Sequence, residues 1–67
     1  MRIELNGEPV ELAAGASVAQ AVDALGADPA RGLAVAVDGE VVPRSAWDAT
    51  ALREGQQVEV LHAVQGG

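Results

Sequence analysis

The chain has 67 residues, a formal net charge of −6 and no cysteine. A chain of this length forms one small domain, and without cysteine it has no disulfides, thiolate metal sites or cysteine nucleophiles. Its four arginines are scattered and lysine is absent, which argues against a nucleic-acid interface, and no apolar run approaches the roughly 20 residues that span a bilayer.

The start of the chain has the pattern of a β-hairpin. Ile3 and Leu5 alternate with polar residues, and the alternation returns at residues 10–12. Asn6–Gly7 between the two segments is a strong turn signal, because both central positions of a type I′ turn need a positive φ. The alternation is unlike the apolar block of a signal peptide, so we expect a cytoplasmic protein with no membrane segment.

A short amphipathic helix is predicted after this hairpin. Ser17 is a favourable N-cap, and Gly26 supplies the residue that ends a helix at the C′ position. Between them, apolar residues with helical spacing form one stripe: Val18, Ala21, Val22 and Leu25. A loop is expected from Ala27 to Gly32.

A second hairpin is predicted next. Residues 33–37 are a continuous apolar run, which indicates a strand buried on both faces or nearly so. Asp38–Gly39 repeats the turn chemistry of Asn6–Gly7, and Val41–Val42 is expected to return as a short strand that ends at Pro43.

A crossover and a last strand complete the predicted domain. Residues 45–52 are expected to form a helical turn or an irregular connection in which Trp47, the single aromatic residue, is anchored in the core. Val58 and Val60 then alternate with polar residues in a strand that ends near Ala63.

The order of these elements indicates the fold. The first and last strands can lie parallel at the centre of a sheet, with the helix across one face. The expected class is therefore α+β, a β-grasp (ubiquitin-like) fold with a mixed sheet of about five strands and one main helix. An SH3-like barrel fits less well, because it has no place for a two-turn helix after the first hairpin. We expect the domain to span residues 1–63 and a flexible tail to span residues 64–67.

The last residues are the candidate functional site. Two terminal glycines are weak evidence by themselves, because chain ends often have no function. Here they follow the last strand of a compact domain directly, which favours the Gly67 carboxylate as the working group. Gly66, with Gln65 and Val64 before it, would thread a narrow channel, because glycine lacks Cβ and reaches conformations that other residues avoid.

A carboxylate is a poor electrophile, so a partner must first activate it with ATP as an acyl-adenylate, from which a nucleophile such as sulfide can then displace AMP. A protein that works in this way needs no nucleophile, general base or bound cofactor of its own. His62, the single histidine, cannot form a metal site alone. It shares the parity of Val58 and Val60, so we expect it at the edge of the core in a structural or docking role. The acidic residues are spread singly and are predicted to form a solvated face.

A docking surface is predicted beside the tail. Leu61 and Ala63 have the opposite parity from the valines of the last strand, so they are expected on the open face of the sheet. Val41, Val42 and Arg44 are candidates to extend this surface. Interfaces usually combine an apolar centre with a charged rim, although a lone exposed leucine is also common. The net acidity serves either solubility or steering toward a basic surface of a partner.

Several segments also have the pattern of a known family: Asn6–Gly7–Glu8, Ser17–Val18, the run AVAVDGEVVPRSAW from Ala34 to Trp47, Leu52, Glu54–Gly55 and the end Val64–Gln65–Gly66–Gly67. On these residues the chain resembles the ThiS family, ubiquitin-like sulfur carriers of thiamine-thiazole biosynthesis, over essentially its whole length.

The resemblance implies a set of partners. An E1-like adenylyltransferase of the ThiF type would activate Gly67 with ATP, a cysteine desulfurase pathway would supply sulfur, and a thiazole synthase of the ThiG type would consume the thiocarboxylate. Asp38 and Gln56 stand where the family usually has Asn and Asp. Asp is as competent as Asn before Gly in a turn, and neither change touches the tail.

Other interpretations stay open. The small subunit of molybdopterin synthase uses the same tail chemistry, but that family typically carries Phe in the core and often Pro before the glycines, where this chain has no Phe and has Val64–Gln65. A ubiquitin-like protein modifier is a further candidate. A non-catalytic β-grasp interaction module, whose glycines are merely a frayed end, belongs to a different functional class.

Overall fold

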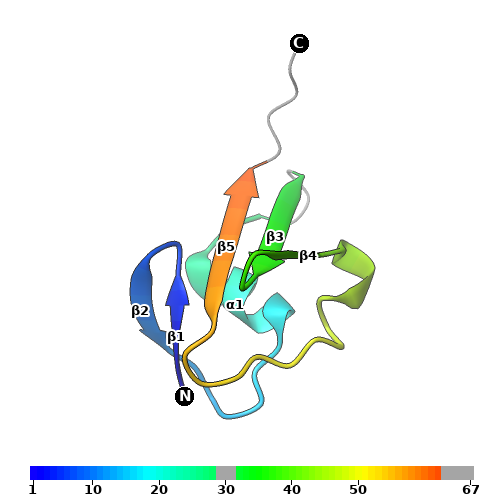
Figure 1. Ribbon diagram of the computed structural model, residues 1–67. Helices are drawn as coiled ribbons and strands as arrows, with labels where there is room; N and C mark the ends of the chain where they lie inside the picture. The colour runs from blue at the N-terminus through cyan, green and yellow to red at the C-terminus, as the bar shows by residue number, and fades with distance from the viewer. Residues whose placement is uncertain (29–31, 63–67) are drawn as a thin grey trace.

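The computed structural model describes residues 1–28 and 32–62 of the chain. Within them the elements follow in the order β1, β2, α1, β3, β4, η2 and β5 (Figure 1). The strands are Arg2–Leu5 (β1), Glu8–Glu11 (β2), Leu33–Val37 (β3), Glu40–Val42 (β4) and Gln57–His62 (β5). The helix α1 spans Val18–Leu25, and the 3₁₀ turn η2 spans Arg44–Ala46.

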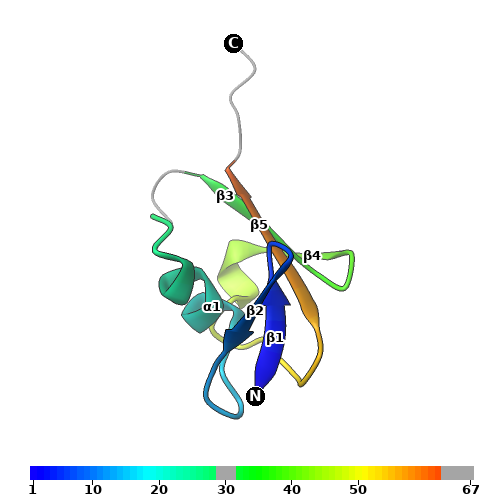
Figure 2. The ribbon, with the colours of Figure 1, turned by 90° about the vertical axis from the view of Figure 1, so that its left-hand side faces the viewer.

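The described strands form a mixed five-stranded sheet in the order β2-β1-β5-β3-β4. β5 lies at its centre, parallel to β1 and antiparallel to β3, and the arrows of β1 and β5 point the same way in Figure 1. Figure 2 shows α1 on one side of this sheet. The predicted β-grasp arrangement is thereby confirmed, with the first and last strands parallel at the centre of the sheet.

Both predicted hairpin turns have the expected backbone. Asn6 and Gly7 have φ values of 51° and 83°, and Asp38 and Gly39 have φ values of 50° and 83°. A positive φ at both central positions defines the type I′ turn, whose twist matches that of the strands it joins. Asn and Asp reach this region more readily than other non-glycine residues, so these two dipeptides direct the chain back on itself.

α1 is capped at both ends by the residues that the sequence predicts, Ser17 and Gly26. The Ser17 hydroxyl accepts a hydrogen bond from the Gln20 backbone N–H (3.3 Å), and the Gln20 side chain accepts one from the Ser17 N–H (2.8 Å). This reciprocal capping box satisfies two donors at the helix N-terminus. Gly26 ends the helix with a φ of 77°. No helix in the described part of the chain is long and apolar enough to cross a membrane.

The core lies between α1 and one face of the sheet. It contains Ile3, Leu5, Val18, Ala21, Val22, Val35, Val37, Trp47, Leu52, Val58 and Val60. Leu25, the predicted fourth member of the helical stripe, is instead 41% exposed. It is the last residue of α1, next to the Gly26 cap, and lies at the margin of the packed interior.

β3 is buried on one face, whereas the apolar run predicts burial on both. Val35 and Val37 face the core, but Ala34 is exposed and Ala36 is half-buried. None of the described elements covers the second face of the sheet (Figure 2). Alanine is small enough to lie on that face with little apolar area in water. The continuous apolar run is therefore an alternation of buried valines with outward-facing alanines.

Trp47 anchors the crossover from β4 to β5, as predicted. Its side chain is 5% exposed, and its Nε1–H donates to the Val42 carbonyl at 2.9 Å. The Arg44 guanidinium carbon lies 6.0 Å from the centroid of the indole ring, within the range of a cation–π contact. After η2, the Thr50 hydroxyl donates to the Ala46 carbonyl at 2.7 Å.

Candidate functional site

The predicted sulfur-attachment residue and the tail before it lie outside the described residues: Ala63, Val64, Gln65, Gly66 and Gly67. The structure describes the strand from which they continue, β5, as far as His62. The candidate site is therefore built from β5 and the elements on either side of it.

The backbone pairing of β5 extends further along the strand on one edge than on the other. On one side, the pairing with β3 runs to Leu33↔His62 at the end of the strand. On the other side, the pairing with β1 stops at Leu5↔Val58, and the chain then turns away at Asn6. The last residues of β5 therefore have a strand neighbour on the β3 side only.

Leu61 lies on the open face of the sheet, as predicted, and is 62% exposed. It pairs with Ala34 on β3, while Val41 on β4 pairs with Ala36 and is 74% exposed. Residues directly opposite on paired antiparallel strands share a face, as do residues two apart on one strand. These four side chains therefore form one apolar surface, which we call the open-face patch: Ala34, Ala36, Val41 and Leu61.

Acidic groups border the open-face patch. Glu59 lies on β5 directly opposite Ala36, and Glu4 on β1 pairs with Gln57. Glu59, Glu4 and Gln57 are all exposed. An apolar centre beside charged groups is the usual anatomy of a protein–protein interface.

Two of the predicted docking residues lie apart from this patch. Val42 pairs with Val35, which faces the core, and is itself partly buried against that core. Arg44 lies over the ring of the buried Trp47. Both therefore lie apart from the open-face patch, which contains Leu61 and Val41 of the predicted docking residues that the structure describes; a docking role for Val42 and Arg44 stays a prediction.

The prediction that His62 lies at the edge of the core is wrong, because its side chain is exposed. It has the parity of Val58 and Val60, which point into the core. Figure 2 shows, however, that the ends of β3 and β5 extend past α1. The helix therefore does not reach far enough along the strand to cover this position.

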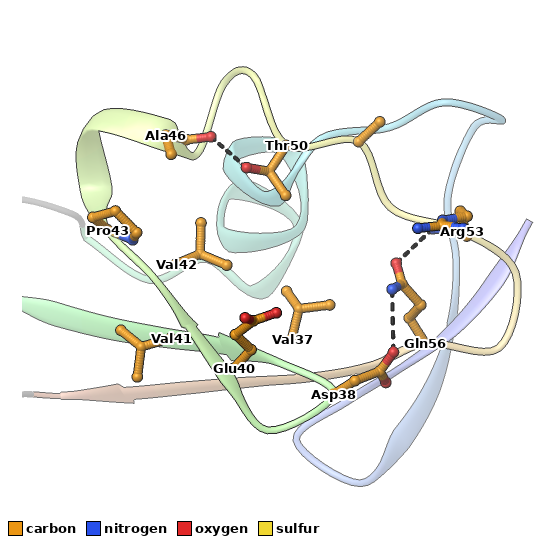
Figure 3. A pocket seen from close by; sticks show the side chains of 11 residues that line it. Val37, Asp38, Glu40, Val41, Val42, Pro43, Ala46, Thr50, Arg53 and Gln56 are labelled. Atoms are coloured by element: carbon orange, nitrogen blue, oxygen red, sulfur yellow. Dashed lines mark hydrogen bonds between the residues drawn. The ribbon is translucent and has the colours of Figure 1, made fainter.

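An open groove of about 530 Å³ lies between the β3–β4 hairpin and the crossover to β5 (Figure 3). Hydrogen bonds cross one end of it. Gln56 Nε2 donates to Asp38 Oδ2 at 3.1 Å, and the Arg53 backbone N–H donates to Gln56 Oε1 at 2.8 Å. Asp38 and Gln56, the two departures from the family pattern, are thus partners of each other. Their contact ties the crossover to the hairpin turn and indicates a structural role.

The described residues bring together no three histidine, cysteine, aspartate or glutamate side chains of the kind that hold a metal ion. None of the buried side chains among them is polar or charged. The feature of these residues that fits a function is the open-face patch, an exposed apolar surface beside the strand that continues into the predicted tail.

Sequence reasoning found Leu61 and Val41 but missed the two alanines of the open-face patch. Ala34 and Ala36 are hidden in the apolar run of β3, and only the register with β4 and β5 shows which of its residues face outward. Their small size beside Leu33, Val35 and Val37 was the one available signal in the sequence.

Comparison with known proteins identifies related chains. The family model described as "ThiS family" matches residues 3–67. The sulfur carrier protein ThiS of Escherichia coli is 30% identical over 67 residues, which are 100% of both chains. A thiazole synthase of Magnetococcus marinus is 39% identical over 67 residues, which are 100% of this chain but only 20% of that relative. This chain therefore spans about one fifth of the length of the thiazole synthase.

Solved structures agree with these sequence matches. The crystal structure of the thiamine biosynthesis protein ThiS from Geobacter metallireducens has a TM-score of 0.84 and 35% identity, with 100% of both chains covered. The solution structure of a thiamine biosynthesis protein from the same organism has a TM-score of 0.78 and 36% identity, covering 100% of this chain and 88% of that one. With its sequence pattern, its β-grasp topology and these matches in agreement, the chain belongs to the ThiS family.

Proposed function

We propose that this protein is a sulfur carrier of thiamine biosynthesis whose Gly67 carboxylate is adenylated and then converted to a thiocarboxylate. The observation that carries this proposal is the match to the sulfur carrier ThiS of E. coli over the full length of both chains. The fold shared with ThiS of G. metallireducens supports it. In this scheme the protein is a co-substrate of other enzymes and catalyses nothing itself.

The chemistry follows from the low reactivity of a carboxylate. On an E1-like adenylyltransferase of the ThiF type, an oxygen of the Gly67 carboxylate attacks the α-phosphorus of ATP and pyrophosphate leaves. Sulfide can then attack the acyl carbon and displace AMP. Alternatively, a persulfide displaces AMP, and a thiol reduces the resulting acyl disulfide to the thiocarboxylate. Sulfur thereby replaces one carboxylate oxygen. ATP is bound by the partner, and Gly66, which lacks Cβ, lets the tail enter a narrow channel.

The open-face patch is the proposed docking surface for these enzymes. Its most exposed members, Leu61 and Val41, come from two strands and lie beside the acidic Glu59. Leu61 is one residue from the described end of β5, so an enzyme that binds this patch also contacts the strand that leads into the tail. A partner with an apolar centre and a basic rim would complement it.

A thiazole synthase of the ThiG type is the proposed acceptor of the sulfur. The thiazole synthase of M. marinus contains a segment that matches this whole chain. A carrier joined to its acceptor in one chain raises the local concentration of each for the other, which is consistent with a functional partnership. A cysteine desulfurase pathway is the proposed source of sulfur.

Intact-mass spectrometry tests the proposal. The protein is incubated with ATP, an E1-like adenylyltransferase of a ThiS-containing pathway and a sulfide source, and we expect its mass to rise by the difference between sulfur and oxygen. A variant lacking Gly67 is the control; we expect it to keep the fold, because the described core ends at Val60, and to gain no mass. An unmodified wild-type chain beside a modified native carrier would refute the proposal.

The acceptor is tested in a second step. The thiocarboxylated protein is mixed separately with a thiazole synthase and with the large subunit of a molybdopterin synthase. We expect sulfur to be lost from the carrier only with the thiazole synthase and its other substrates. Loss of sulfur only to the molybdopterin enzyme would assign the protein to that pathway.

A further inference from the structure

Asn6 makes hydrogen bonds to β5 that its place in a hairpin turn does not require. Its backbone N–H donates to the Val58 carbonyl at 2.9 Å. Its side-chain Oδ1 accepts from the Val60 N–H at 2.8 Å, and its Nδ2 donates to the Val60 carbonyl at 3.2 Å. The turn residue of the first hairpin therefore binds both backbone groups of one residue near the end of the last strand.

The carboxamide of Asn6 acts here as an added peptide unit of β1. The backbone pairing of β1 with β5 stops at Val58, because the chain reverses at Asn6 and Gly7. A side-chain amide carries the same donor and acceptor as a peptide group, so it can continue the ladder by one residue where the backbone cannot. Asp in its place would keep the acceptor, lose the donor and set a carboxylate against the Val60 carbonyl.

The other end of β5 is held by the corresponding residue of the second hairpin. Asp38 Oδ1 accepts from the Gln57 N–H at 2.9 Å, and the Asp38 backbone N–H donates to the Gln57 carbonyl at 2.7 Å. Asp38 acts at the first residue of the strand from the β3 side, and Asn6 acts at Val60 from the β1 side. The two turns thus fix opposite ends of the same strand, and only Asn6 acts at the end that leads to the tail.

We propose that Asn6 is a positioning residue for the C-terminal carboxylate, an inference that rests on the proposed carrier function. By closing the β1 side of β5 at Val60, its side chain fixes the point at which the tail leaves the domain. His62 is the last described residue of the strand, and Gly67 follows five residues later. Five residues span at most about 18 Å even when fully extended, so the point at which the tail leaves the domain limits where the Gly67 carboxylate can reach.

Loss of the two side-chain bonds from Asn6 to Val60 releases one further residue of β5, which an adenylyltransferase must then order. Without the Asn6 side chain, the Val60 N–H and carbonyl lose the partners described here and are left to water. The end of β5 is then paired with β3 alone. The enzyme must then immobilise additional backbone before Gly67 meets ATP. Ordering roughly one further residue corresponds to about a tenfold loss of rate. Leu61 stays paired with Ala34 on β3, so we expect docking through the open-face patch to change little.

The test compares Asn6→Gly with Asp38→Gly. Glycine keeps the positive φ at either turn, and each substitution removes two side-chain hydrogen bonds. Adenylation is measured by pyrophosphate release at a temperature well below both melting transitions. Amide exchange at Val60 and Gln57 reports each bond directly. Asn6→Asp, which keeps the acceptor to Val60, is the second variant in case Asn6→Gly does not fold.

We expect Asn6→Gly to speed amide exchange at Val60 and to lower kcat about tenfold with KM nearly unchanged. Asp38→Gly is expected to speed exchange at Gln57, with a change in kcat of less than about twofold. Asn6→Asp is expected to fall between wild type and Asn6→Gly. Equal losses of kcat at both turns, or an unchanged kcat in the Asn6 variants, would overturn the inference and leave the carrier function standing. A wild-type chain that is never adenylated would remove the carrier function, and this inference with it.

Discussion

Trp47 packs its indole into a core that is otherwise aliphatic and donates its N–H to the Val42 carbonyl. An aromatic side chain buries roughly 150–250 Å², more than any aliphatic one, and a domain of this length has few residues with which to build an interior. The crossover from β4 to β5 is otherwise irregular beyond η2. We therefore expect the packing of the crossover against the core to depend strongly on Trp47.

Replacing Trp47 by Ala is expected to destabilise the domain by about 3–5 kcal/mol, because it opens a large cavity under α1. Trp47→Phe keeps most of the apolar area and loses the bond to Val42, at a cost of about 1 kcal/mol from that bond. Urea denaturation followed by far-ultraviolet circular dichroism measures both. Equal destabilisation by the two variants would show that the hydrogen bond, not the buried area, is what matters.

Leu61→Glu is expected to leave the fold intact and to lower kcat/KM for adenylation about tenfold, since it replaces the largest apolar side chain of the open-face patch by a charged one. Ala24→Glu adds the same charge at an exposed position of α1, away from the patch, and serves as the matched control. Pyrophosphate release with the adenylyltransferase gives both values. Unchanged kinetics for Leu61→Glu would exclude this face as the docking surface.

At the scale of elements, the sequence predicts strands, turns and helix well because each has a local signal. Asx–Gly pairs mark both hairpins, and Ser17 and Gly26 mark both ends of α1. The errors concern how far one element covers another. Leu25 and His62 have the spacing of core residues but are exposed, and each is the last residue of its element. How far a helix covers a strand depends on packing between segments distant in the sequence.

α1 is only eight residues long, and isolated helices of that length are marginal in water. Its capping box should therefore contribute measurably to the stability of the whole domain. Ser17→Ala is expected to cost about 1 kcal/mol, and Gln20→Ala, which removes only the returning bond, less. The midpoint of urea unfolding measures both; no shift in either variant would show that packing alone holds the helix N-terminus.

At the scale of the whole molecule, the site was predictable only in part. The exposed position of Leu61 follows from strand parity, whereas the role of the tail, which lies outside the described residues, stays a prediction. The contact of Asn6 with Val60 joins residues 54 positions apart and exists only because β1 and β5 run parallel side by side. No local pattern contains that information, since Asn6–Gly7 is fully accounted for by its turn.

The net charge of −6 gives a prediction at the same scale. If the acidity steers the carrier toward a basic enzyme surface, the association rate should fall about tenfold as added salt screens the attraction, while the dissociation rate changes little. Stopped-flow association at several sodium chloride concentrations measures this. A rate independent of salt would assign the acidity to solubility alone.

Because Trp47 is the single aromatic residue of the chain, all of its near-ultraviolet absorption and fluorescence come from one buried indole. Unfolding transfers that indole to water and shifts its emission to longer wavelength. The indole lies on the core side of the sheet, whereas the open-face patch lies on the opposite face. The protein therefore carries an optical reporter of folding that lies away from the proposed docking surface, and variants of the patch can be checked for integrity without an added label.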